Sequence, residues 1–258
     1  MEEVKTYHLK KKIIIKGRTR VLTGLHIGGT NNALSIGGMD NAVIRNPVDN
    51  KPYLPGSSLK GKMRALLELT YGYITKKRMG NVEYVGSENL EYITTKLFGN
   101  APKEGDQRPS RVIVRDGMLT DESVEKLSNT DFLYTEGKTE VVIDRITSAA
   151  VPRQLERVPA GAEFTLNIVL NIIEEDGKDH EEELIRNLFK ALELVQDDYL
   201  GGSGSRGSGQ VAFVIEEIYE RDSSFYTSQK GSNSENVVEL YKKQYIPDSI
   251  EVKAKANA

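Results

Sequence analysis

The first feature of this sequence that points to chemistry is a run of glycine and serine around one arginine. Residues 201–209 read G-G-S-G-S-R-G-S-G, and Arg206 is the one charged residue among them. Glycine lets backbone amides approach a ligand closely, and the guanidinium adds positive charge, so this glycine loop favours a phosphate backbone as ligand. The candidate contacts are Gly202, Ser203, Gly204, Ser205 and Arg206. A flexible linker is the alternative, but the run lies directly between a strongly periodic helix pattern and a good strand pattern.

The glycine loop does not match the two common nucleotide-binding motifs. A Walker A loop ends in Lys followed by Ser or Thr, and a Rossmann fingerprint follows a strand and opens a helix. Residues 201–209 lack the lysine, follow a predicted helix and precede a predicted strand. Both motifs therefore fail on residues and on context.

A second candidate anion site lies at a predicted helix start. Pro55 and Gly56 supply turn residues before Ser57 and Ser58, and apolar residues then recur at helical spacing. Lys60 and Arg64 are four residues apart and so share one helical face. The hydroxyls and amides of the two serines and the two cations favour a phosphate contact, with a solvated helix surface as the alternative.

Asp40 is the one acid between Glu3 and Asp49, in a glycine-rich stretch within a basic segment. From the residues alone, a turn aspartate that bonds its own backbone competes with a catalytic carboxylate. Histidine is a common general acid, but we assign His26 to ligand contact or loop support, and His8 and His180 to the surface. Three scattered histidines without cysteine do not predict a zinc site.

Periodic segments indicate the elements that must position these residues. Alternating patterns predict strands, helical spacing predicts helices, and glycine or proline marks their ends. The predicted strands are 10–22, 111–119, 139–146, 163–173 and 210–219, and the predicted helices begin near Ser57 and span 88–98 and 180–196.

The order of the firm elements predicts the fold class. Strand, helix, strand, strand, helix, strand is the order of an α+β, ferredoxin-like core, which hosts many activities and cannot name one. We expect this core over residues 1–221, with insertions at 72–110 and 121–161, and an appendage with a partly flexible end over 222–258.

Composition restricts the classes of function. The 258 residues fit one elaborated core, and the absence of cysteine excludes disulfides and thiolate chemistry and favours a reducing cytoplasm. No run approaches the length of a membrane span, so we expect no membrane partner. The net charge is −3, but residues 1–64 carry twelve Lys or Arg against four acids, whereas residues 174–198 carry ten acids against three bases. The basic segment could contact a phosphate backbone, or its charges could form solvated surface faces.

Several segments together resemble one protein family. The glycine loop followed by Q-V resembles that of the RAMP proteins of CRISPR systems. The chain also resembles the repeated backbone subunit of the type III-A Csm complex in these segments: T-G-L-H-I-G-G (23–29), I-G-G-M-D-N-A-V-I-R-N-P (36–47), P-G-S-S-L-K-G-K-M-R (55–64), L-F-G-N (97–100), I-D-R-I-T (143–147) and P-R-Q-L-E-R (152–157). The resemblance covers about residues 22–213.

The resemblance implies a cytoplasmic antiviral protein that polymerises on CRISPR guide RNA with further copies of itself and other subunits, and cuts complementary target RNA at regular intervals. A β-hairpin thumb, placed within residues 134–164, would wedge into the guide–target duplex. Arg145 and Arg153 flank the expected tip and could clamp the duplex, or they could pair with nearby acids such as Glu140 or Asp144. The family's cleavage residue matches Asp40. It would assist attack of the RNA 2'-hydroxyl on the adjacent phosphate, either by accepting its proton or by holding Mg²⁺ or another divalent cation.

Three alternatives stay open at this point. The chain could be a purely architectural RNA-binding module, against which Asp40 counts. It could be a guide-processing RAMP endoribonuclease, for which His26 is the one candidate residue. It could also be the equivalent subunit of a type III-B complex, which would share fold and chemistry.

Overall fold

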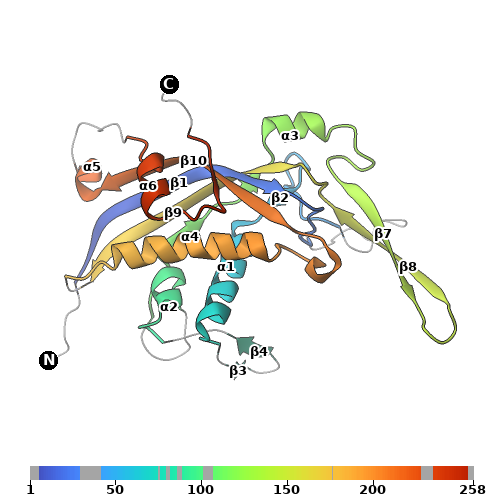
Figure 1. The fold of residues 1–258 in the computed structure, drawn as a ribbon, viewed down its shortest axis with the longest axis horizontal. Helices are drawn as coiled ribbons and strands as arrows, with labels where there is room; N and C mark the ends of the chain where they lie inside the picture. Colours follow the sequence, from blue (N-terminus) through green and yellow to red (C-terminus); the bar gives the residue numbers. More distant parts are fainter. Residues whose placement is uncertain are drawn as a thin grey trace.

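A computed structural model describes residues 6–29, 42–74, 76–79, 82–85, 89–100, 107–175, 177–227 and 235–254. Its centre is a five-stranded sheet in the order β11-β10-β1-β9-β5 (Figure 1). β1 runs antiparallel to β10 and β9, β5 runs antiparallel to β9, and β11 runs parallel to β10. These strands are Tyr7–Val21 (β1), Val112–Val114 (β5), Glu163–Glu175 (β9), Val211–Asp222 (β10) and Glu251–Val252 (β11). The predicted α+β class with a central sheet is confirmed.

Buried and exposed side chains alternate along the central strands. On β1, Ile13 and Ile15 are fully buried on one face, while Lys16, Arg18 and Arg20 lie on the other, outer face. β9 and β10 bury Ile168 and Phe213 on the same side as Ile13. One face of the sheet therefore builds the core, and the other carries charge.

Two long helices cover the inner face of the sheet. α1 spans Gly56–Tyr71, α4 spans Glu181–Asp197, and the two pack against each other (Figure 1). Both have an apolar stripe at helical spacing. The buried residues of these stripes are Leu59, Met63 and Leu67 on α1 and Leu184, Leu188, Leu192 and Val195 on α4. They join the strands in one hydrophobic core.

Two predicted elements differ from the structure. The helix expected over 88–98 is α2, which begins only at Ile93 and ends at Phe98, because the side chain of Asn89 accepts a hydrogen bond from the amide of Glu91 in a local turn. The strand expected over 111–119 is two strands, β5 and β6 (Gly117–Met118), and β6 pairs with β2 (Tyr53–Leu54). The chain leaves the sheet at Asp116, whose carboxylate accepts a 2.7 Å bond from the amide of Gly56 at the start of α1.

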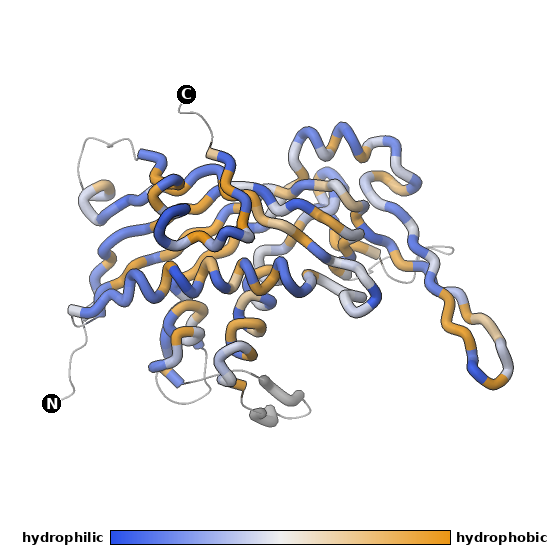
Figure 2. Tube along the Cα trace, in the orientation of Figure 1, coloured by the Kyte–Doolittle hydropathy of each residue, from blue (hydrophilic) through white to orange (hydrophobic). Residues whose placement is uncertain are grey.

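The insertions contain regular structure of their own. Within 72–110, β3 (Lys76–Met79) pairs with β4 (Val82–Val85). Within 121–161 lie α3 (Asp121–Lys126), which Thr120 caps, and an antiparallel hairpin of β7 (Glu136–Ile143) and β8 (Ala150–Arg157). The hairpin projects from the body of the molecule (Figure 1), and its far end is largely hydrophobic (Figure 2).

The described part of the C-terminal segment packs on the body. After α5 (Ser223–Thr227), α6 (Val238–Gln244) buries Val238 and Tyr241, and Ile250 precedes β11. Tyr241 meets Phe189 of α4 edge to face and donates a hydrogen bond to Glu220. In the part of the chain that the structure describes, no helix is long and apolar enough to cross a membrane.

Candidate nucleic-acid interface

Residues 24–29 form a root segment that joins the glycine loop to the hairpin. Leu25 and Val158, just after β8, exchange two backbone hydrogen bonds of 2.8 Å. On its other side, Gly24 O accepts a 3.0 Å bond from Gly209 N, and His26 O accepts a 2.8 Å bond from Gly202 N. Three segments far apart in the sequence are thus held together by backbone bonds, so their relative position does not depend on surface side chains.

His26 lies at the centre of this junction. Its ring Nδ1 is 2.7 Å from the carbonyl oxygen of Glu156, and its backbone oxygen holds the glycine loop. A Cβ on Gly201 would lie 2.2 Å from His26 O, so only glycine fits at this close approach. The geometry suits the predicted role of His26 in loop support.

The glycine loop is a turn with fixed ends. Gly201 and Gly209 have positive φ, and Leu200 N donates a 2.8 Å bond to Gly209 O across the base. Residues 204–206 form a 3₁₀ turn, before which Ser203 takes a left-handed conformation. Arg206 projects from this turn, is largely exposed, and forms a 2.9 Å ion pair with Glu140 on β7. The loop is therefore a shaped element rather than a linker.

The ion pair with Arg206 affects the ionisation of Glu140. The pKa of its carboxyl is lowered, first by the hydrogen bond from Arg206, against a smaller effect of burial, and then by Lys138. Glu140 thus stays ionised and holds the one arginine of the glycine loop. A phosphate group that binds Arg206 must compete with this carboxylate.

The start of α1 carries a cation that has no acidic partner among the described residues. The first turn of α1 contains no acid and no side-chain cap. Lys60 is half-buried and has no hydrogen bond or ion pair within the described residues; burial, and then the nearby charge of Arg64, lower its pKa. Arg64 is instead tied to Glu68 at 2.8 Å and to Gly99 O at 3.0 Å. The structure thus separates the two predicted cations: Lys60 is available for an anion, and Arg64 is anchored.

The two serines at the helix start differ in exposure. Ser57 is exposed and Ser58 is partly buried, with its amide bonded to Pro55 O at 3.0 Å. Their hydroxyls are not part of any helix cap.

The hairpin carries two cations and an apolar surface. Arg145 and Arg153 are exposed, and neither has an ion pair with the described acids. Glu140 is occupied by Arg206, and the carboxylate of Asp144 accepts bonds from the backbone of Ile146 and Thr147, which lowers the Asp144 pKa. The exposed apolar side chains near the tip are Val141, Val142, Ile143, Ile146 and Val151.

Sequence reasoning missed a buried ion pair under the root segment. Glu156 is 6% exposed and binds Arg45 Nη2 at 2.6 Å, the Thr135 hydroxyl at 2.6 Å and Val43 N at 2.8 Å. Burial alone raises the pKa of Glu156, but the bonds from Thr135, Arg45 and Val43 outweigh it and hold the pKa below its usual value. The sequence places Arg45 and Glu156 in two quoted motifs but gives no spacing signal that joins them.

This ion pair lies beside the two ends of the segment that contains Asp40. Ile44 N donates to Ile27 O at 2.9 Å, and Gly29 N donates to Ala42 O at 3.2 Å. Asp40 itself lies outside the described residues. Among the residues that are described, no three His, Asp or Glu side chains come together in a group that could hold a metal ion.

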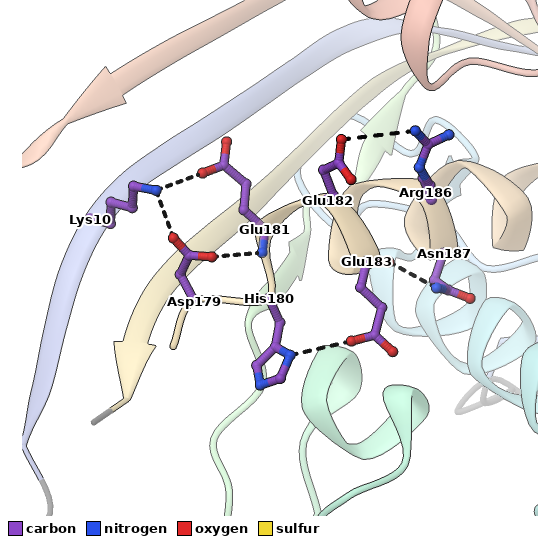
Figure 3. A pocket seen from close by; sticks show the side chains of 8 residues that line it. All are labelled: Lys10, Asp179, His180, Glu181, Glu182, Glu183, Arg186 and Asn187. Atoms are coloured by element: carbon purple, nitrogen blue, oxygen red, sulfur yellow. Dashed lines mark hydrogen bonds and ion pairs between the residues drawn. The ribbon is translucent and has the colours of Figure 1, made fainter. Parts of the chain in front are cut away.

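A pocket of about 630 Å³ at the N-terminal end of α4 is a contrasting charged site (Figure 3). Lys10 contacts Asp179 at 2.6 Å and Glu181 at 3.1 Å, and the ring of His180 faces Glu183 at 3.4 Å. The charged side chains that line it contact one another, so we assign no ligand to it.

Comparisons with known proteins agree on one family. The model of the RAMP superfamily matches residues 19–212. The chain is 40% identical to "CRISPR system Cms endoribonuclease Csm3" of Methanocaldococcus jannaschii, over 88% of this chain and 89% of that protein. It is 42% identical to the protein of the same name from Enterococcus italicus, over 80% and 92%. It also resembles a chain of the Csm3-Csm4 subcomplex of the type III-A CRISPR-Cas interference complex, with a TM-score of 0.54, 29% identity and coverage of 92% and 96%.

Proposed function

This chain belongs to the RAMP superfamily and, within it, to the Csm3 endoribonucleases, and we propose that it is the RNA-binding backbone subunit of a type III-A CRISPR effector complex. It binds a CRISPR guide RNA and cleaves target RNA that is complementary to the guide. Its partners are RNA and other subunits of the complex, and we propose further that copies of the chain assemble in a filament along the guide.

The observation that carries this proposal is the junction of the glycine loop, the root segment and the hairpin. The backbone bonds of Gly24, Leu25 and His26 bring three of the family-like motifs into one place. The sheet order β10-β1-β9-β5, with α1 and α4 on its inner face, supports a ferredoxin-like core as their scaffold. We also retain a core of 1–221, an appendage of 222–258 and a cytoplasmic location as proposals.

Guide binding is assigned to the glycine loop and to the start of α1. Lys60 supplies a half-buried cation that lacks a counter-ion in the described structure, and Arg206 supplies a second cation on a turn rich in backbone amides. Ser57, Ser58 and residues 202–205 add donors, and His26 holds the loop in place. Such contacts recognise phosphate and sugar without regard to base sequence, as a guide of any sequence requires.

We assign the hairpin to contact with the guide–target duplex. Its exposed valine and isoleucine side chains can pack against base faces, while Arg145 and Arg153 can contact phosphates on either side. This arrangement suits a thumb that separates neighbouring segments of the guide–target duplex.

Cleavage is assigned to Asp40. The proposed step is attack of the 2'-hydroxyl oxygen on the adjacent phosphorus, with loss of the 5'-oxygen of the next nucleotide, which leaves a 2',3'-cyclic phosphate and a 5'-hydroxyl. Splaying of the strand would supply the in-line geometry, and Asp40 would accept the 2'-hydroxyl proton or hold a divalent cation. The described side chains do not form a metal site by themselves. Dependence on Mg²⁺ or another divalent cation therefore stays a proposal, to be tested by chelation.

The test uses a complex reconstituted with guide RNA and the Asp40→Ala chain. We expect target cleavage to be abolished while target affinity stays within about twofold of the wild type, since a catalytic carboxylate contributes mainly to the chemical step. Labelled target RNA resolved on a gel measures cleavage, and a filter assay measures affinity. Unchanged cutting would overturn the assignment of Asp40. Loss of both activities would show that residue 40 serves binding instead.

A further inference from the structure

Tyr199 joins the end of α4 to the glycine loop, and its ring fills the space beside Gly204. A Cβ on Gly204 would lie 2.0 Å from Cγ of the Tyr199 ring and 2.2 Å from both Cδ atoms. The backbone of the turn therefore rests directly on the ring. No residue larger than glycine fits at position 204 unless Tyr199 moves.

The ring is held in turn by α1. The ammonium group of Lys62 lies 3.8 Å from the centroid of the Tyr199 ring, within the range of a strong cation–π contact. The same ammonium forms a 2.9 Å ion pair with Asp198. Lys62, Asp198 and Tyr199 thus connect the helix that carries Lys60 to the glycine loop that carries Arg206.

Other contacts fix the ends of the glycine loop but not its middle. Gly202 and Gly209 are bonded to the root segment, and Leu200 is bonded to Gly209. In the middle turn, Arg206 N bonds Ser203 O and Gly207 N bonds Gly204 O, so these bonds are internal to the turn. Outside the turn, the described contacts of residues 204–206 are the Tyr199 ring and the exposed pair of Arg206 with Glu140.

The hydroxyl of Tyr199 takes no part in this arrangement. It has no hydrogen bond to any described residue, although the side chain is partly buried and lines a pocket of about 380 Å³ beside the loop. The ring, and not its polar end, makes the contacts. This distinction provides a matched control variant.

We propose that Tyr199, held by Lys62, is a positioning residue for guide binding that sets the 204–206 turn so that Arg206 and Lys60 reach the same RNA strand. The inference rests on the proposed function, because it assigns a task within the same guide site. Tyr199 acts through Arg206 and needs no contact of its own with RNA.

The experiment measures the affinity of the full chain for a labelled single-stranded guide RNA as a function of salt. We expect Tyr199→Leu to lower affinity about tenfold and to reduce the slope of log affinity against log salt by about 0.7, the loss of one phosphate contact. Tyr199→Phe keeps the ring and should bind within about twofold of the wild type. Lys62→Met should lower the affinity a few-fold. Lys62→Arg, which keeps a cation over the ring, should bind about as well as the wild type. Unfolding midpoints identify any variant that loses affinity by failing to fold.

A double-mutant cycle separates positioning from direct contact. If Tyr199 acts through Arg206, then Arg206→Ala lowers affinity in the wild-type background but has little further effect in the Tyr199→Leu background. An Arg206→Ala effect of the same size in both backgrounds, or a Tyr199→Phe variant as weak as Tyr199→Leu, would overturn the inference and leave the guide site intact. If Arg206→Ala and Lys60→Ala both leave wild-type affinity unchanged, the proposed guide site itself fails, and the inference fails with it.

Discussion

Strand β1 and helix α1 both come from the basic N-terminal segment, yet α1 carries a cation without the carboxylate partner that most cations of β1 have. On β1, Arg18 contacts Glu163 at 3.0 Å and Glu216 at 2.8 Å, and Arg20 contacts Glu163 at 2.8 Å and Glu251 at 3.3 Å. Lys10, Lys11 and Lys16 also have carboxylate partners. On α1, Lys62 and Arg64 pair with Asp198 and Glu68, but Lys60 has no carboxylate partner among the described residues.

The difference teaches that pairing, and not the local count of charge, marks the surface available to RNA. The acidic segment of 174–198 folds back on the basic one, since Asp179 and Glu181 are the partners of Lys10 and Lys11. Part of the charge asymmetry along the sequence is therefore cancelled in space. Unpaired cations at the start of α1 and on the hairpin are candidates for phosphate, and Arg206 of the glycine loop is intermediate, because it is paired but largely exposed.

The largest effect is expected at the ion pair of Arg45 with the buried carboxylate of Glu156. Glu156→Met leaves the guanidinium of Arg45, whose side chain is 19% exposed, without its carboxylate. Removal of one partner from a buried ion pair typically costs about 3–5 kcal/mol of unfolding free energy. Chemical denaturation measures this loss, and Lys16→Ala on the outer face of the sheet, which breaks an exposed pair, should cost less than about 1 kcal/mol.

Two further measurements test the interpretation of this pair. The double variant Arg45→Met with Glu156→Met should recover part of the stability, because it leaves no unpaired buried charge. The Glu156 carboxyl has a lowered pKa in the folded protein, so its contribution is complete above the ordinary glutamate pKa of about 4.3 and is lost as pH falls through the lower folded value. The stability gap between wild type and Glu156→Met should therefore close in acid. A gap that is independent of pH would contradict the ionic interpretation.

How much could be predicted from the sequence differs between the fold and the site. Long periodic segments were predicted well, and β1 and α4 fall close to their expected bounds because many residues share one pattern. Short elements were predicted less well, because single side chains set their bounds. A turn at Asn89 precedes the late start of α2, and Asp116, just after β5, bonds to the start of α1. Asp40 stays a prediction from family resemblance.

The arrangement of the site follows from contacts between residues far apart in the chain. Arg45 and Glu156 are separated by 111 positions, and Lys62 meets Tyr199 only because α1 packs beside α4. No periodicity encodes such pairs. The glycine loop was recognisable from composition, but its closeness to His26 required the fold.

The second largest effect is expected for the substitution of Lys60, the unpaired cation of α1. Lys60→Ala should lower affinity for single-stranded guide RNA about tenfold and reduce the log–log salt slope by about 0.7, as for the loss of one charged phosphate contact. Lys16→Ala, which removes a paired cation from the same basic segment, should change affinity less than about twofold. Fluorescence anisotropy across a salt series measures both. Equal losses for the two variants would show that pairing does not decide which cations bind RNA.

The smallest effect is expected for Glu140. Its partner Arg206 is intermediate between the paired cations of β1 and the unpaired Lys60. Arg206 is paired, but its side chain is 62% exposed, so a phosphate can displace the carboxylate at little cost. Glu140→Gln removes the competing charge and keeps the size of the side chain, so guide affinity should rise about two- to threefold at low salt, with an unchanged unfolding midpoint. Glu136→Gln, on the same strand but paired with Arg157, is the control and should leave affinity unchanged. A fall in affinity for Glu140→Gln would contradict this expectation, because it would mean that the carboxylate orients Arg206 toward the RNA and does not compete with phosphate.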